Sequence, residues 1–240
     1  MNRPLVRMLW CLSPNFGDEL APYLARRAGK EPAYTLSPGR YVLSGSMLNN
    51  CTKNDTAWGC GIAHEQHRVP AGITILSVRG PKSLYRAREH NNNVPEVIAD
   101  SGFILPRIYT NSLQGENLEG EVIVPHYVDF EKLTAANPNK HVVNILDPVE
   151  KVLDQILAAE IIRSSSLHGL VVAAAYGRKF QWIPSALVNG VEYKYDDFYQ
   201  SMGLKLSEDV VSCPESKQLD LIQIASQTFP FPEIFKSKAV

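Results

Sequence analysis

Residues 161–177 have the sequence IIRSSSLHGLVVAAAYG, which joins a short apolar strand to a helix of small and aliphatic residues. Three serines, a leucine, a histidine and a glycine lie where the two elements meet. The first backbone N–H groups of a helix have no partner within the helix, and the helix dipole adds about half a positive charge there. Serines at such a helix start add hydroxyl groups. The junction therefore predicts a site for an anion such as a phosphate or a carboxylate.

His168 lies in the first turn of this predicted helix, where it could pass a proton to a group attached to the bound anion. Serines also cap helices that bind nothing, and a first-turn histidine is often a hydrogen-bonded structural residue. The segment alone leaves both interpretations open.

Short apolar runs alternate with helical patterns along the rest of the chain. In the first half we expect strands at 7–12, 41–44, 73–78 and 97–99, and helices at 18–28 and 81–90. In the second half we expect strands at 121–128, 141–146, 160–163 and 179–183, and helices at 130–136, 148–159, 167–176 and 217–228. Asp147 and Pro148 are the expected N-cap and first residue of one of these helices. Alternating strands and helices predict parallel sheets covered by helices.

A polar stretch without periodicity at 109–120 separates the two halves. We therefore expect an α/β protein of two lobes, residues 1–119 and 120–240, with the active site in the cleft between them. Open α/β sheets bind ligands at the carboxyl ends of their strands. Candidate side chains at such ends are Asn15, Asp18, Arg79 and His126.

Each of these side chains has a functional and a structural interpretation. Arg79 is suited to bind a phosphate or carboxylate through two N–H groups, or it is an ordinary surface arginine. Asn15 and Asp18 are suited to sugar hydroxyls, although Asp18 could instead cap its helix. His126 faces the cleft or is packed at the end of its strand.

The composition excludes several classes of function. The 240 residues carry a formal net charge of −1, with 45% hydrophobic and 20% charged residues. This balance gives no electrostatic basis for binding nucleic acid. No apolar run is long enough for a transmembrane helix, and the N-terminal residues do not have the pattern of a signal peptide. The 4 cysteines are scattered, so reduced thiols and a cytoplasmic protein are expected.

One group of residues has the spacing of metal ligands. Cys60, His64 and His67 would share one face of a helix and could then hold a metal ion. Glycines on both sides of Cys60 indicate a turn instead, so we expect no metal site.

Several motifs occur in a fixed order along the chain: NFGDELAPYL (15–24), GSMLN (45–49), WGCGI (58–62), SVRGPKS (77–83), DSGFILP (100–106) and SSSLHGLVVAAAYG (164–177). Together they resemble the polysaccharide pyruvyl transferase family, particularly its exopolysaccharide ketal-pyruvate branch. The resemblance implies two Rossmann-like lobes arranged as in GT-B glycosyltransferases. It also implies transfer of pyruvate from phosphoenolpyruvate onto two hydroxyls of a sugar, in a polysaccharide or its lipid-linked precursor. A cyclic ketal forms and phosphate leaves; no cofactor or metal is implied beyond the donor itself.

The resemblance also implies roles for individual residues. His168 would be the acid–base catalyst beside the phosphate, and Arg79 would bind the anionic groups of the donor. A mechanism fitted to the residues adds Asp18 as a candidate base for the acceptor hydroxyl. The residues that would hold the phosphate at the helix start are Ser164, Ser165, Ser166, Leu167 and Gly169.

One position departs from the family pattern. Many members have an arginine where this chain has Ser166, so one guanidinium of the expected donor site is missing. Arg163, Arg107 or the serine hydroxyls would have to compensate.

Two other functions stay open from the sequence. A glycosyltransferase that uses a nucleotide-sugar would need an acidic residue late in the second lobe, for which Glu192, Asp196 and Asp197 are available. A non-catalytic sugar- or anion-binding protein would keep the fold without turnover. The sequence does not identify the acceptor sugar, the bridged hydroxyl pair or the oligomeric state. Loops at 34–40 and 49–56 are the expected acceptor contacts, and a lipid-linked acceptor would bring the protein to the inner membrane surface.

Overall fold

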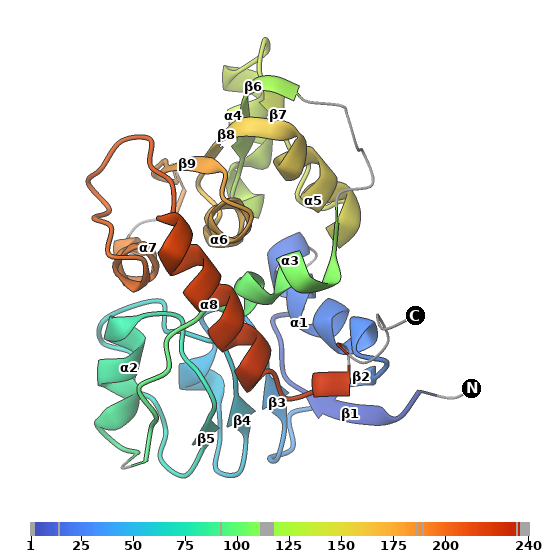
Figure 1. Ribbon diagram of the computed structural model, residues 1–240, viewed down its shortest axis with the longest axis vertical. Helices are drawn as coiled ribbons and strands as arrows, with labels where there is room; N and C mark the ends of the chain where they lie inside the picture. The colour runs from blue at the N-terminus through green and yellow to red at the C-terminus, as the bar shows by residue number, and fades with distance from the viewer. Residues whose placement is uncertain are drawn as a thin grey trace.

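The computed structural model describes residues 3–13, 15–91, 93–110, 118–185, 187–188, 190–233 and 235 of the chain. These residues form two sheets, which lie towards opposite ends of the molecule in Figure 1. The first sheet has the order β2-β1-β3-β4-β5 and the second the order β7-β6-β8-β9. Neighbouring strands in both sheets run parallel, which confirms the predicted α/β class with parallel sheets.

The strands of the first sheet are short: β1 (Leu5–Met8), β2 (Glu31–Tyr34), β3 (Tyr41–Val42), β4 (Thr56–Ala57) and β5 (Thr74–Ile75). The second sheet consists of β6 (Leu118–Val124), β7 (His141–Val142), β8 (Ala159–Ser164) and β9 (Lys179–Trp182). The helices are α1 (Phe16–Arg27), α2 (Pro81–Arg88), α3 (Leu105–Ile108), α4 (Phe130–Ala136), α5 (Val149–Ala158), α6 (Leu167–Ala175), α7 (Glu192–Ser201) and α8 (Glu215–Thr228). The 3₁₀ turns η1 (Leu48–Asn50), η2 (Ser101–Ile104) and η3 (Tyr127–Asp129) lie between them.

Helix α6 lies at the centre of the molecule, between the two sheets (Figure 1). All of its residues are buried, as a helix that is apolar on every side requires. Two glycines allow its close packing. A Cβ at Gly169 would lie 2.5 Å from Ser164 Oγ, and a Cβ at Gly102 would lie 2.4 Å from Val171 Cγ1. The start of α6, which carries His168, is therefore fixed by packing on both sides.

The apolar core is continuous between the two sheets. One cluster of buried side chains includes Met8 of β1, Phe103 of η2 and Ile162 of β8. Helix α8 runs from the second sheet back towards the first (Figure 1), and Thr228 at its end accepts a hydrogen bond from Trp58 Nε1 at 2.9 Å. Helix α8 therefore packs against the first sheet. The predicted division at 119/120 stays a prediction.

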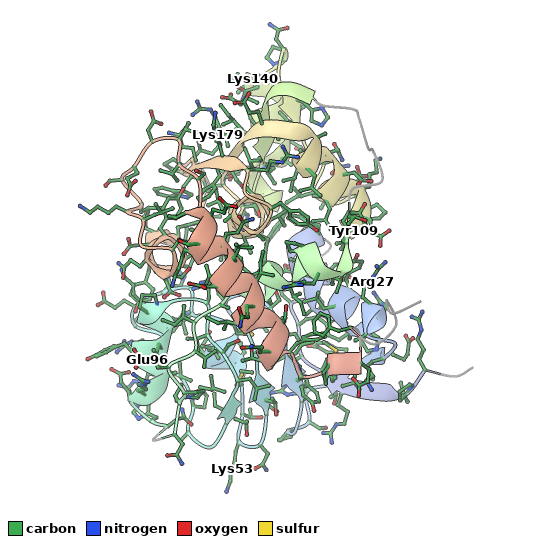
Figure 2. All side chains as sticks on the ribbon, viewed as in Figure 1. Arg27, Lys53, Glu96, Tyr109, Lys140 and Lys179 are labelled. Carbon is green, nitrogen blue, oxygen red and sulfur yellow. The ribbon has the colours of Figure 1, made fainter. Side chains whose placement is uncertain are left out.

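Polar contacts on one side of the molecule also connect the two halves. Arg27 of α1 and Tyr109, which follows α3, are labelled on that side in Figure 2. Arg27 Nη2 donates to the Ile108 carbonyl at 2.5 Å, and the Tyr109 hydroxyl donates to Asp154 of α5 at 2.6 Å. The segment that ends at residue 110 is thus tied to helices of both halves.

The structure corrects several details. Asn15, not Asp18, caps α1, because its side-chain oxygen accepts the N–H of Asp18. Helix α5 has Pro148, not Asp147, at its N-cap, and Asp147 pairs instead with Lys151. The expected strand at 97–99 is reduced to an isolated bridge between Val78 and Ile98. Residues 111–117 of the expected linker lie outside the described residues.

Candidate functional site

The carboxyl ends of both sheets open into one cavity of about 200 Å³. In each sheet the strand order reverses between two neighbours, β1 and β3 in the first sheet and β6 and β8 in the second. The loops after these four strands all contribute to the cavity wall. Such reversal points are where open α/β sheets bind ligands. The predicted site residues that line the cavity are Asn15, Asp18, His126, Ser166, Leu167 and His168.

The start of α1 brings Asn15 and Asp18 to the cavity. Asn15 Nδ2 donates to Asp18 Oδ2 at 2.6 Å, while Asn15 Oδ1 accepts the N–H of Asp18 at 3.1 Å. The N–H of Phe16 donates to the Ile145 carbonyl of the second half at 2.8 Å. Burial raises the pKa of Asp18, against the effect of its hydrogen bond with Asn15. A carboxylate with a raised pKa is a stronger base than an exposed one.

His168 is enclosed by Ser44, which follows β3, and by Phe16 and Gly17 at the start of α1. Its Nε2 lies 3.3 Å from Ser44 Oγ, and the Phe16 ring meets it edge to face at 6.4 Å. A Cβ at Gly17 would lie 2.3 Å from Nδ1, so the glycine of the NFGDE motif makes room for the ring. Burial lowers the pKa of His168 to about 3, and the positive charges of Lys194 and Arg79 add to this effect. The imidazole is therefore neutral at pH 7.

The serines before α6 have unequal surroundings. Ser164 Oγ lies 2.7 Å from the Val124 carbonyl and accepts the N–H of Ser166 at 3.0 Å. Ser165 Oγ accepts the N–H of His126 at 2.8 Å and donates to Asp129 at 3.1 Å. These two hydroxyls hold neighbouring loops together inside the protein. Ser166 is the N-cap of α6 and faces the cavity, and Gly169 serves the packing of the helix.

Arg79 is fully buried and is not part of the cavity wall. Its Nε donates to Asp197 of α7 at 3.1 Å, its Nη2 to the Ile62 carbonyl at 2.6 Å, and its Nη1 to Ser46 Oγ at 2.8 Å. Of these partners, Ser46 does line the cavity. The geometry gives Arg79 a positioning role through Ser46 and Asp197. Its predicted direct contact with the donor stays a prediction.

The ion pair of Arg79 explains the glycines of two motifs. A Cβ at Gly61 would lie 2.3 Å from the Arg79 guanidinium carbon, and a Cβ at Gly80 would lie 2.0 Å from the Asp197 carbonyl oxygen. Asp197 also accepts the N–H groups of Lys82 and Ser83 in the first turn of α2. WGCGI and VRGPKS thus form the surface on which α7 is fixed.

Lys194 is a charged residue of the cavity wall that sequence reasoning missed. It lies one helical turn before Asp197 on α7 and lines the cavity. Burial lowers the pKa of Lys194 to about 8, the charge of Arg79 acts in the same direction, and Asp18 acts against both. No local sequence pattern indicates that this lysine belongs to the site. Its position depends on the contact of α7 with α2, a helix more than a hundred residues earlier in the chain.

Other candidate residues lie elsewhere. Arg163, considered as a replacement for the missing guanidinium, pairs with Glu121.

The residues with the spacing of metal ligands do not share one helix face, because residues 60–67 form no helix. Cys60 is buried with its sulfur 3.0 Å from the Val42 carbonyl oxygen, whereas His64 Nδ1 contacts the Gly190 carbonyl. Within the described parts of the chain, no group of three His, Cys, Asp or Glu side chains is placed to hold a metal ion. Nor does any helix there combine the length and apolar character needed to cross a membrane.

A second cavity of about 520 Å³ adjoins the first, since Asn15 belongs to both walls. It lies between α1 and α5, where Glu19, Tyr23 and Glu150 contribute to its surface. Tyr23 and carboxylates are side chains that can contact sugar rings and hydroxyls.

Two parallel sheets with a cavity at their reversal points define an α/β protein, and this cavity is the candidate ligand site. The polysaccharide pyruvyl transferase family matches residues 42–185, more than half of the chain, and the chain belongs to this family. The matched range includes Ser44, Arg79 and His168 but neither Asp18 nor Lys194. The family expected from the motifs is confirmed, while its ketal-pyruvate branch stays a prediction.

A similar protein is the uncharacterized protein L143 of Acanthamoeba polyphaga mimivirus. It is 24% identical over 170 residues, which cover 67% of this chain and 59% of the relative. The chain therefore spans less than two thirds of that relative's length. No solved structure matches the chain.

Proposed function

We propose that this protein transfers the pyruvyl group of phosphoenolpyruvate to two hydroxyls of a saccharide, forming a cyclic ketal and releasing phosphate. Besides family membership, the main support is that His168, Asp18 and Lys194 meet at one cavity. A buried proton carrier, a carboxylate of raised pKa and a cation are the groups that this reaction needs.

The reaction consists of one proton gain and two hydroxyl additions at the donor. A proton adds to the methylene carbon of phosphoenolpyruvate and makes C2 electrophilic. The first sugar hydroxyl forms a C–O bond to C2 and loses its proton. The second hydroxyl then forms a bond to C2, the bond from C2 to the phosphate oxygen breaks, and the second proton leaves. One released proton replaces the one given to the methylene carbon, and the other goes to phosphate.

His168 is the proposed proton donor and Asp18 the proposed base. A bound dianion beside His168 favours the charged imidazolium and raises its pKa. Donor binding would thereby protonate His168, and His168 would then give that proton to the methylene carbon of the donor. Asp18 faces the same cavity and would accept a hydroxyl proton from a sugar, for which the adjoining cavity between α1 and α5 offers room.

Phosphate release tests the proposal. Purified protein is mixed with phosphoenolpyruvate alone and with each of a panel of hexoses, N-acetylated hexoses and oligosaccharides. We expect phosphate release that requires one class of saccharide, and a fall of about 10²- to 10⁴-fold in His168→Gln with donor binding retained. Release that does not depend on any saccharide, or stabilisation only by a UDP-, GDP- or CMP-sugar, would refute it.

The nucleotide-sugar alternative finds little support among the acidic residues considered for it. Asp197 is buried against Arg79 and the start of α2, and Asp196 pairs with Lys82 at 2.5 Å. Glu192 is exposed. Neither aspartate is free to bind a ribose without breaking these contacts.

A further inference from the structure

We propose that Lys194 is the anion-binding cation of the cavity and stands in for a guanidinium at position 166. The identity of the anion rests on the proposed function, whereas the role of the lysine does not. Among the described residues that line the cavity, Lys194 is the only lysine or arginine. His126 and His168 face the same space, but burial lowers their pKa values to about 4 and about 3, so neither carries a positive charge at neutral pH.

Two arginines considered above, one as a donor ligand and one as a replacement for the missing guanidinium, have partners of their own. Arg79 is enclosed and pairs with Asp197 at 3.0 Å, and Arg163 pairs with Glu121 near the strands of the second sheet. In contrast, no carboxylate among the described residues lies within the 4.0 Å of an ion pair from Lys194 Nζ. A partly buried ammonium without such a partner is available to an incoming anion.

Contacts on both sides of Lys194 fix its place. The hydroxyl of Tyr195, the next residue, donates to the Ser165 carbonyl at 2.6 Å, which ties α7 to the turn before α6. One helical turn further on, Asp197 accepts hydrogen bonds from Arg79 and Ser83. The lysine is therefore held between the serine turn and the first sheet, and Ser166 lines the same cavity.

The position of Lys194 links anion binding to the proton carrier. Its positive charge is one of the causes that lower the pKa of His168. An anion bound to Lys194 offsets that charge, so the imidazole gains a proton more readily once the cavity is filled. Lys194 thus acts both as a contact for the anion and as a control on His168.

Calorimetric titration with inorganic phosphate and, separately, with phosphoenolpyruvate tests the inference. Removing one charge-assisted hydrogen bond lowers affinity by about 10- to 100-fold, which is the loss expected for Lys194→Met. Lys194→Arg keeps the charge and should stay within about threefold of the wild type. The double variant Lys194→Met with Ser166→Arg should regain about tenfold, because residue 166 faces the same space.

A matched control removes a lysine outside the cavity. Lys82 pairs with Asp196 and lies over the Tyr193 ring at 4.6 Å, so Lys82→Met loses the same charge near α7 and should bind both anions normally. Thermal melts establish that each variant is folded, and Lys194→Gln replaces Lys194→Met if the latter is not. Unchanged phosphate affinity in a folded Lys194 variant overturns the inference. Phosphate binding that needs Lys194, with phosphoenolpyruvate inert, supports the lysine's role and overturns the proposed donor.

Discussion

Replacing Gly17 with alanine tests the packing that holds His168 in the cavity. The new Cβ would lie 2.3 Å from Nδ1 and 2.8 Å from Cγ of the ring. Non-bonded atoms of this kind rest at about 3.5–4.0 Å, so the ring has to move by more than about 1 Å. That movement breaks the contact between Nε2 and Ser44 Oγ at 3.3 Å.

The expected consequence is a large loss of activity with a smaller loss of stability. Overpacking a core site costs about 1–3 kcal/mol of the free energy of unfolding, and each kcal/mol shifts the Tm by roughly 2–4 °C in a chain of this size. A catalytic group misplaced by about 1 Å costs about 10²-fold in rate. We therefore expect kcat/KM for acceptor-dependent phosphate release to fall about 100-fold in folded Gly17→Ala.

A double variant identifies the cause. With His168→Ala present, the ring that the new methyl group meets is absent and only the Cβ of residue 168 remains close, at 3.1 Å, so adding Gly17→Ala should destabilise the protein clearly less than it does when His168 is present. Equal destabilisation in both backgrounds would show that the methyl group acts elsewhere. Wild-type kcat/KM in Gly17→Ala would refute the enclosed position of His168.

Three further measurements test the buried charges. Arg79→Met leaves the Asp197 carboxylate buried without its guanidinium, so we expect the free energy of unfolding in urea to fall by about 3–5 kcal/mol; a loss below about 1 kcal/mol would contradict the pairing. The pKa of His168 is lowered from 6.5 to about 3 by folding, so the unfolded chain binds more protons between these values and stability falls as the pH drops from 6.5 towards 3. The variant His168→Gln should lose less stability over this window, and parallel curves would argue against a buried neutral ring. Calorimetry at pH 7 in buffers of different ionisation enthalpy should detect proton uptake when phosphoenolpyruvate binds, and uptake that persists in His168→Gln would assign it to another group.

Elements with a strong local pattern could be predicted from the sequence. The helix expected at 130–136 has the bounds of α4. The strand expected at 160–163 and the helix expected at 167–176 differ from β8 and α6 by no more than one residue at any end. Apolar periodicity and capping residues determine such elements locally. Strands β2 and β4 were not predicted, because EPAY and TA are too short to show an alternation of apolar and polar residues. Helix α7 was not predicted either, because its charged and aromatic residues do not form an apolar stripe along one face.

The site could be predicted only where one segment supplies it. His168 and Ser166 follow directly from the SLHG turn and do face the cavity. Arg79 looks like a ligand-binding residue in its own segment, because the aspartate that pairs with it lies 118 residues further on. Lys194 could not be found for the same reason. Its place depends on that ion pair and on the hydroxyl of Tyr195, neither of which leaves a local signal.

The charge balance of the cavity connects anion binding with proton transfer in the proposed reaction. Lys194 and Asp18 both lie on the described wall of the cavity, and each shifts the pKa of the other towards its charged form. Two opposite charges make a partly buried cavity less costly than a single one. A donor with a phosphate and a carboxylate brings more negative charge than Lys194 alone can offset. In the proposed reaction, the remaining excess favours a proton on His168, which is the proton that the methylene carbon of the donor would receive. A second permanent cation at position 166 would weaken this coupling, so under the proposed mechanism Ser166 leaves protonation of His168 as the response to donor binding.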